Sequence, residues 1–379
     1  DVTRYHTAQE NYYFKQSSGV NSILENELDI TSDVPLNYVI VDGALSDDFG
    51  FSKGQSISQY DFEMLLQGKY SDGKKCTRQH KNSGYDFTFS APKTISIAGL
   101  VTDKDPKIVK CHDDAVKETM KEIEKYYSCA NPRQGLEVKS EGMLWVSIKD
   151  GFSREHDPHL HTHVILTNIT KYDNKFMALR TRKIMRRDFN RMWGTYYRMK
   201  LGQKIKDLDH SITYLKGGEW RLDKISQSCE KEFSTRRQQI VKEKNKGLSE
   251  YEAWLKSRKK KNARIDKSKI TSYWQDRAKA TNTSTIKENI EQALRERKEW
   301  IEQAEFVIEA RQEREGRKNT TESERWLLAI DRAIHKSATA SEEGVIGEFI
   351  AEEMRAGNWM SNMDFDNLRE RLTRQVEEG

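Results

Sequence analysis

The fold is decided by the stretch His156-Asp157-Pro158-His159-Leu160-His161-Thr162-His163-Val164-Ile165-Leu166, which passes from a turn into an apolar run. Four of the nine histidines of the chain fall within its first eight residues. Alternate residues of a strand point to one face, so we expect His159, His161 and His163 to share a face. Imidazole suits Zn, Ni, Cu and Mn, so the pattern predicts a metal site without selecting the ion.

The dipeptide Asp157-Pro158 predicts the turn that delivers this strand, because proline fixes its own φ and restricts the residue before it. Two histidines at alternate positions of a strand can also be an ordinary surface pair, and alternation alone does not separate the two interpretations. The density of histidines where a strand leaves a loop favours ligands, since such junctions commonly carry function.

Neighbouring segments predict an antiparallel sheet with helices around it. Residues 85–89 alternate as a strand does, and a loop at 149–158 joins the apolar strand at 143–148 to the histidine strand. Two strands joined by a short polar loop most simply pair antiparallel. Helical periodicity predicts helices over 59–68, 108–127 and 181–208, and Gly217-Gly218 predicts a hairpin between 212–215 and 219–222.

Beyond Asp223 the composition is almost entirely helical, with helices expected over 284–317, 321–338, 341–357 and 361–377. The expected fold class is therefore α+β, with an antiparallel-sheet core followed by a mainly α-helical C-terminal region. We expect three parts: a core over 1–225, a basic helical part over 226–300 and an acidic helical part over 301–379.

Charge is distributed unevenly along the 379 residues, although the net charge is only +5. Residues 221–300 hold 22 Lys and Arg against 12 Asp and Glu, whereas residues 301–379 hold 11 against 18. A strongly basic middle suits a protein that binds a polyanion. Lys259 and Lys260 lie in its densest run, which taken alone fits a solvated loop as well as it fits DNA contact.

Other features of composition narrow the class of protein. Aromatic residues interleave with the basic run, a mixture that suits stacking on nucleic acid bases but also ordinary helix packing: Tyr251, Trp254, Tyr273 and Trp274. The sequence holds no apolar run near the roughly 20 residues that span a bilayer, so we expect no membrane insertion. The four cysteines lack CxxC pairing and are expected to be reduced structural thiols of a cytosolic protein.

Four segments carry a resemblance to a known family. They are Tyr5 with Asn11-Tyr12-Tyr13, the run Gly84-Tyr85-Asp86-Phe87-Thr88-Phe89-Ser90-Ala91-Pro92-Lys93, the run Ser153-Arg154-Glu155-His156-Asp157-Pro158-His159-Leu160-His161-Thr162-His163, and Glu232-Phe233-Ser234 with Arg236 and Ile240. In order and in content they resemble motifs of conjugative relaxases of the TraI/TrwC (MobF) type, within the HUH endonuclease superfamily. The resemblance spans roughly residues 1–240.

The resemblance implies a reaction. A tyrosine attacks a phosphodiester of single-stranded DNA at a plasmid origin of transfer, leaving a 5′-phosphotyrosine that is later resealed. Counting back from Asn11-Tyr12-Tyr13, Tyr5 matches the first tyrosine of the family, although His6 stands where the family often has a second one. The resemblance leaves two roles for Tyr12 or Tyr13: attack in a second DNA strand transfer, or packing against DNA bases. Without the resemblance, buried or stacking roles would be the preferred interpretation of these tyrosines.

The resemblance also implies one divalent metal ion, with Mg or Mn favoured and Zn or Ni as alternatives. His161 and His163 match two of three family ligands, and Asp86 matches an acid that hydrogen-bonds a ligating histidine. The third position, eleven residues before His161, is Asp150 where the family has histidine. A carboxylate favours harder ions such as Mn or Mg. His159, which shares the strand face, and His156 are the alternatives for the third ligand.

The remaining expectations concern DNA and partners. Arg154 and Lys93 are candidates for phosphate contact, with Lys259 and Lys260 further along. By resemblance, residues 1–225 form an HUH catalytic core, 226–300 are fingers that grip DNA, and 301–379 are a C-terminal region or linker. The resemblance also implies a hairpin beside the single-stranded site, relaxosome accessory proteins, a type IV coupling protein, and residence in the bacterial cytoplasm with export to the recipient cell.

Two other functions fit the same residues. A rolling-circle replication initiator or transposase of the same superfamily would share the metal and the tyrosine and differ in its DNA. A catalytically weakened single-stranded DNA-binding protein is the second alternative, and Asp150 is the reason to consider it. The chain carries no Walker A motif, which excludes helicase activity from it, so it is expected to be a relaxase fragment or a short form.

Overall fold

The computed structural model describes residues 2–5, 39–77, 82–133, 136–215, 218–257, 270–281, 321–336, 341–358 and 365–378. For residues 2–5 it describes the backbone alone. Tyr12, Tyr13, Lys259 and Lys260 lie outside the described residues, as does the expected helix over 284–317.

A six-stranded antiparallel sheet forms the core, in the order β1-β4-β8-β7-β2-β3. Its strands are β1 (Val2–Tyr5), β2 (Val39–Asp42), β3 (Gln55–Ser56), β4 (Gly84–Ser90), β7 (Trp145–Phe152) and β8 (Pro158–Thr167). The histidine strand β8 lies inside the sheet, hydrogen-bonded to β4 on one side and to β7 on the other. The α+β fold class and the antiparallel pairing of the two apolar strands are confirmed.

Strand β7 is longer than the sequence predicts. A loop was expected from Lys149, but β7 continues to Phe152, and Asp150 pairs directly with His161 across the ladder. The two polar residues that suggested a loop are buried, since Lys149 is 4% and Asp150 2% exposed. Lys149 is held by an ion pair with Asp113, so its charge is compensated inside the fold.

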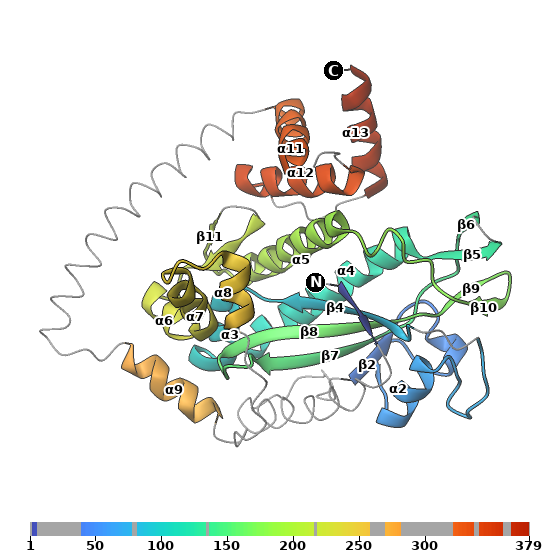
Figure 1. Cartoon of the computed structure of the whole chain (residues 1–379), viewed down its shortest axis with the longest axis horizontal. Coiled ribbons are helices and arrows are strands. Elements are labelled where there is room, and N and C mark those ends of the chain that lie inside the picture. Colours follow the sequence, from blue (N-terminus) through green and yellow to red (C-terminus); the bar gives the residue numbers. More distant parts are fainter. Residues whose placement is uncertain are drawn as a thin grey trace, which may run out of the picture.

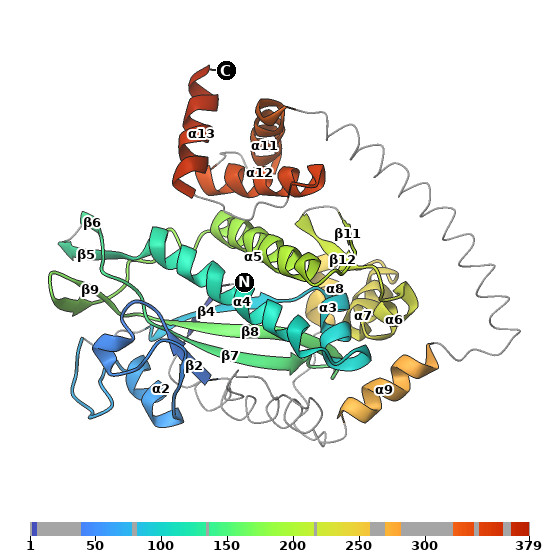
Figure 2. The same ribbon diagram turned by 180° about the vertical axis from the view of Figure 1, so that it is seen from behind.

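Two long helices cover one face of the sheet, as Figures 1 and 2 show. Helix α4 (Pro106–Tyr127) begins with proline at its first position, and the Asp105 side chain accepts from the Lys107 amide at 2.8 Å. Helix α5 (Arg187–Asp207) begins six residues later than predicted, because the stretch from Thr181 forms turns instead. Aromatic residues of β4 and α5 fill the core between them, including Phe89 and Tyr197.

The opposite face carries a smaller core at one end of the sheet. Helix α2 (Gln59–Leu66) starts with a capping box between Ser58 and Asp61 and buries Phe62 completely. Phe62 belongs to the same cluster as Val41 and Val146 of the sheet. This core leaves the other end of the same face, where the histidines lie, to polar residues.

Short elements connect and extend these layers. They are η2 (Asp47–Phe49), α3 (Lys93–Ile97), η3 (Ala98–Thr102), β5 (Cys129–Arg133), β6 (Leu136–Lys139), β9 (Thr170–Tyr172), β10 (Lys175–Met177), β11 (Ile212–Tyr214), β12 (Trp220–Leu222), α6 (Gln227–Glu232), α7 (Thr235–Lys244), α8 (Glu250–Lys256) and α9 (Ile270–Ala280). The predicted hairpin is confirmed as β11 and β12. No described helix is long and apolar enough to cross a membrane.

Three helices of the acidic part lie over α5: α11 (Glu322–Lys336), α12 (Glu342–Ala356) and α13 (Phe365–Glu378). Figure 1 shows α12 next to α5 with α11 and α13 beyond it. Gly347 permits a close crossing, since a Cβ there would lie 3.1 Å from Met192 Cα. Glu348, Glu352 and Glu353 of α12 are buried in ion pairs with cations of α11, which explains part of the acidic composition.

We predict that Gly84→Ala weakens the sheet, because a Cβ at Gly84 would lie 2.5 Å from the Leu166 carbonyl oxygen of β8. The expected loss is about 1–3 kcal/mol of unfolding free energy, measured by urea titration. The matched control is Gly194→Ala in α5, where the nearest atom is 4.0 Å away. It should be neutral or stabilising, since alanine favours a helix interior by about 1 kcal/mol. Equal effects of the two variants would contradict the packing argument.

Candidate metal centre

Two histidines of β8 have their ring orientation fixed by hydrogen bonds. His163 Nδ1 lies 2.9 and 3.0 Å from the two carboxylate oxygens of Asp86 on β4. His161 Nδ1 lies 2.8 Å from the carbonyl oxygen of His159. Both acceptors are oxygens, so each Nδ1 carries the proton and donates. The lone pair of each ring is then on Nε2, the arrangement that a metal-binding histidine needs.

Asp150 is the cross-strand partner of His161, so both side chains start from the same face of the sheet. Its Oδ1 accepts from the Phe152 amide at 3.3 Å, next to the irregularity in the β7–β8 ladder. This hydrogen bond holds the Asp150 carboxylate next to the backbone of its own strand. The register supports Asp150 as the third ligand, and this assignment stays a prediction.

The two rival histidines are engaged differently. The His159 ring stacks on the His161 ring with centroids 4.4 Å apart and an interplanar angle of 20°. The His156 ring stacks on Phe152, and its residue has a positive φ of 61° in the turn. Parallel stacked rings point their nitrogens side by side rather than toward one ion. The stacking therefore favours a supporting role for His159 and His156.

The backbone places the proposed ligands on one face, but their side chains do not converge on a single point. Within the described residues, no three His, Cys, Asp or Glu side chains converge in a way that could hold a metal ion. The donor set nevertheless fits a divalent ion, since two imidazoles with the proton on Nδ1 and one carboxylate begin from neighbouring positions of one face. The strand register already brings Asp150 and His161 side by side on this face.

The face of β8 behind the histidines is held by a buried hydrogen-bond chain. Thr162 lies between His161 and His163 in sequence and points to the helices, where its Oγ1 is 2.8 Å from His112 Nε2. His112 Nδ1 in turn lies 2.6 Å from Tyr197 Oη. Complete burial lowers the pKa of His112 well below its usual value, so the ring is neutral, with one nitrogen donating and the other accepting. This chain fixes β8 against α4 and α5.

The predicted DNA contacts differ in accessibility. Arg154 is exposed in the β7–β8 turn, which we define as residues 153–157. Lys93 is turned inward instead, where its Nζ donates to the Pro158 carbonyl at 2.8 Å. Burial lowers the pKa of Lys93 to about 8. Lys93 thus has a structural contact at the start of β8, while phosphate binding by Lys93 or Arg154 stays a prediction.

The backbone of Tyr5 ends β1 away from the two histidines. Tyr5 pairs with Gly84, and Gly84 pairs with Thr167 of β8. Thr167 follows His163 by four residues, which is about 13 Å along a strand, and two strand spacings add about 10 Å across the sheet. The register does not place the Tyr5 backbone beside the two histidines, and the catalytic role of Tyr5 stays a prediction.

Arg277 of α9 joins two of the sequence motifs. Its guanidinium donates to Asp157 at 3.1 Å, to the Glu232 carboxylate at 2.8 Å and to the Glu232 carbonyl at 2.6 Å. It also lies 4.8 Å from the centre of the Phe233 ring. Asp157, only 2% exposed, accepts in addition from the amide and hydroxyl of Thr235 at 2.9 and 3.0 Å. The buried carboxylate of the β7–β8 turn thus holds α7 and α9 together.

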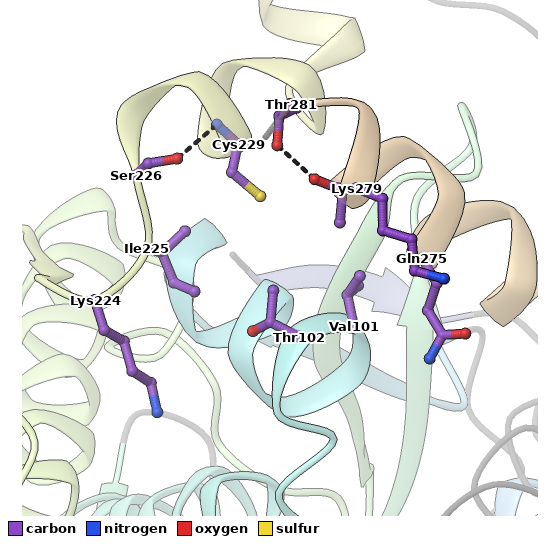
Figure 3. Close-up of a pocket in the computed structure, with 10 residues that line it drawn as sticks. Val101, Thr102, Lys224, Ile225, Ser226, Cys229, Gln275, Lys279 and Thr281 are labelled. Carbon is purple, nitrogen blue, oxygen red and sulfur yellow. Dashed lines mark hydrogen bonds between the residues drawn. The ribbon is translucent and has the colours of Figure 1, made fainter. Parts of the chain in front are cut away.

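Helix α9 is attached to the β7–β8 turn and also borders a cavity. Trp274 Nε1 donates to the His156 carbonyl at 2.6 Å, which adds a second attachment to the β7–β8 turn. A cavity of about 400 Å³ lies where α9 meets η3 and α6, lined among others by Thr102, Cys229 and Gln275 (Figure 3). Trp274 and Arg277 together attach this helix to the β7–β8 turn.

Sequence reasoning missed these supporting residues. Thr162 alternates with the histidines, so its inward direction was predictable, but nothing in the sequence connects it with His112 or Tyr197. Asp157 was interpreted as a turn residue only. Arg277 lies in a basic part of the chain where no local pattern distinguishes it from its neighbours.

Comparison with known proteins decides the family. The TrwC relaxase family matches residues 2–281 of this chain. The chain belongs to the TrwC relaxase family. Multifunctional conjugation protein TraI of Escherichia coli is 29% identical over 203 residues, which cover 49% of this chain but only 11% of TraI. The relaxase family membership thus concerns the first three quarters of the chain.

Solved relaxase structures share the fold. Conjugative relaxase TrwC in a metal-bound complex with oriT DNA superposes with a TM-score of 0.62 at 26% identity, covering 75% of this chain and 99% of that one. TrwC bound to a 27-mer DNA that comprises the recognition hairpin and the cleavage site gives a TM-score of 0.61 at 25% identity, with the same coverage. The relaxase fold expected from the sequence motifs is confirmed.

We predict that Asp86→Asn lowers the affinity for Mn²⁺ by about 10- to 100-fold, because the carboxylate no longer raises the basicity of the His163 ring. Isothermal titration calorimetry measures this directly. Asp47→Asn in η2 is the control, since it removes an exposed carboxylate and changes the net charge equally. An unchanged affinity in Asp86→Asn would show that the Asp86 contact does not serve metal binding.

We also predict that Arg277→Gln loosens α9, because the buried Asp157 and the Glu232 carboxylate lose their cation. Charged hydrogen bonds contribute about 1.5–3 kcal/mol, so amide hydrogen exchange over residues 270–280 should accelerate about tenfold or more. The control is Arg237→Gln, whose ion pair with Glu250 is exposed at both ends and is worth at most about 1 kcal/mol. Equal protection of α9 in both variants would refute the anchoring role.

Proposed function

We propose that this protein nicks and rejoins one strand of DNA at a plasmid origin of transfer during conjugation, through a 5′-phosphotyrosine intermediate. The observation that carries the proposal is the pair His161 and His163, whose Nδ1 atoms both donate so that both Nε2 lone pairs are available on one face. Membership of the TrwC relaxase family supplies the reaction class.

The metal ligands that we propose are Asp150, His161 and His163, with Asp86 orienting His163. A divalent ion bound there would withdraw charge from the non-bridging oxygens of the scissile phosphate. A carboxylate in the set favours Mg or Mn, and Zn or Ni remain alternatives. It also makes the site more anionic, which weakens that withdrawal.

The nucleophile that we propose is one of the N-terminal tyrosines. The sequence motif favours Tyr5 as the nucleophile. The pairing of Tyr5 with Gly84 places its backbone away from the histidines and so favours Tyr12 or Tyr13. Tyr12 and Tyr13 follow Tyr5 by seven and eight residues, a length that spans about 25 Å when extended and so reaches the histidines. Tyr5→Phe, Tyr12→Phe and Tyr13→Phe separate the three.

The reaction conserves the ester bond. As the phenolic oxygen bonds to phosphorus, the phenol loses its proton, the bond to the 3′ oxygen breaks, and that oxygen takes up a proton. Because one phosphodiester replaces another, the step is reversible and resealing needs no ATP. A phenol with a pKa of about 10 is weakly nucleophilic at neutral pH, so charge withdrawal at the phosphate is required.

The partner that we propose is single-stranded origin DNA with an adjacent hairpin, approached along the exposed Arg154 of the β7–β8 turn. Relaxosome accessory proteins, a type IV coupling protein, residence in the bacterial cytoplasm and export with the transferred strand complete the proposal. A weakened enzyme that binds DNA without cutting is the second candidate, favoured by Asp150 and by the lack of convergent ligands among the described residues.

The test is a covalent adduct. Labelled single-stranded DNA containing the origin of the plasmid that carries this protein is incubated with Mg²⁺ or Mn²⁺, then denatured and resolved by electrophoresis. We expect a protein-bound label that one of the three Tyr→Phe variants abolishes and that EDTA prevents. If the wild type binds this DNA but forms no adduct with either ion, the binding-only alternative replaces the enzyme.

A further inference from the structure

Helix α8 exposes two aromatic rings on its surface. Tyr251 is 69% and Trp254 39% exposed, and their rings stack with centroids 6.2 Å apart and an interplanar angle of 17°. The spacing of three residues puts both rings on one side of the helix. Buried Ala253 faces the opposite direction and fixes which side of α8 looks outward. We call Tyr251 and Trp254 the aromatic pair.

Positive charge surrounds the aromatic pair. The guanidinium of Arg236 on α7 lies 5.6 Å from the centre of the Trp254 ring. Residues 235–256, which form α7, α8 and their connection, contain six Lys and Arg against three Glu. A cation over an aromatic face next to further cations matches a chain that alternates flat bases with negative phosphates. This charge favours a nucleic acid over a protein helix as the occupant.

The aromatic pair belongs to the same end of the molecule as the metal face. Gln239 of α7 donates to Glu155 at 3.3 Å, and Thr235 is bonded to Asp157, so α7 is attached to the β7–β8 turn. Figures 1 and 2 show α6, α7, α8 and α9 gathered at the end of the sheet where β7 ends and β8 begins. A strand that reaches His161 and His163 over this turn can continue onto α8.

We propose that the aromatic pair is a stacking platform for bases of single-stranded DNA, on the stretch of the substrate beside the β7–β8 turn. The proposal rests on the proposed function for its substrate class and adds a binding site outside the metal centre. Tyr251 and Trp254 stack on successive bases, and Arg236 contacts a phosphate or keeps its place over the Trp254 ring. Stacking tolerates any sequence, because each base has a flat face.

The test compares two oligonucleotides of equal charge. Fluorescein-labelled dT20 and a 20-mer of abasic sites carry the same phosphates, but only dT20 has bases to stack. Binding is measured by fluorescence anisotropy with EDTA present, so that no strand is cut. The wild type should prefer dT20, and Trp254→Ala together with Tyr251→Ala should weaken dT20 binding about tenfold or more. Affinity for the abasic 20-mer should stay unchanged.

Two further variants control for folding and for chemistry. Trp254→Phe with Tyr251→Phe keeps two rings and should retain most of the preference for dT20. Tyr60→Ala removes an aromatic ring of α2 that is 54% exposed, and this variant should bind both oligonucleotides as the wild type does. Circular dichroism and thermal unfolding confirm that the alanine variant remains folded.

The outcomes separate this proposal from the proposed function. An alanine variant that keeps the wild-type preference for dT20 overturns the platform, whatever the adduct assay shows. Equal loss on dT20 and on the abasic 20-mer also overturns it, since the aromatic pair would then act through charge or folding. A wild type that prefers dT20 through the aromatic pair but forms no adduct supports the platform and refutes the nicking enzyme.

Discussion

Strand β8 is hydrogen-bonded to a neighbouring strand on each side, and the rest of the molecule depends on that constraint. Because side chains alternate, the same ten residues serve two purposes. One face presents His161 and His163 with Asp150 across the ladder, while Thr162 on the other face is fixed by His112 of α4. A slip of one residue would exchange the faces and bury the imidazoles against α4 and α5. Pairing on two sides makes that slip costly, so the fold sets the positions of the proposed ligands.

The β7–β8 turn transmits that rigidity to the helices beside it. Asp157 is buried, so it needs compensation, and Arg277 and Thr235 provide it from α9 and α7. Two motifs far apart in sequence, one around Asp157 and one around Phe233, thus meet at Arg277. Helices α7 and α9 are thereby connected to the strand that carries the proposed metal ligands.

Much of the fold could be predicted from the sequence, and the reasons are local. Apolar residues alternate around Phe87 and recur at helical spacing in α4. Both patterns reflect burial directly, so β4 and α4 could be predicted. The end of β7 was missed because Lys149 and Asp150 are polar, and the sequence does not show that the distant Asp113 pairs with buried Lys149. The two histidines proposed as ligands, His161 and His163, could be predicted from the alternation along the strand and from the resemblance. Arg277 and His112 could not be found, since their partners lie more than forty residues away in the chain and no short-range pattern records such pairs.

The central claim is that Asp150, His161 and His163 form one metal centre. An anomalous difference map from crystals soaked in Mn²⁺ tests it most directly. The account predicts a single strong peak about 2 Å from Nε2 of both histidines and from a carboxylate oxygen of Asp150, with Asp86 still bonded to His163. A peak held by His159 or His156 in place of Asp150, or bound through Nδ1 of either histidine, would contradict it.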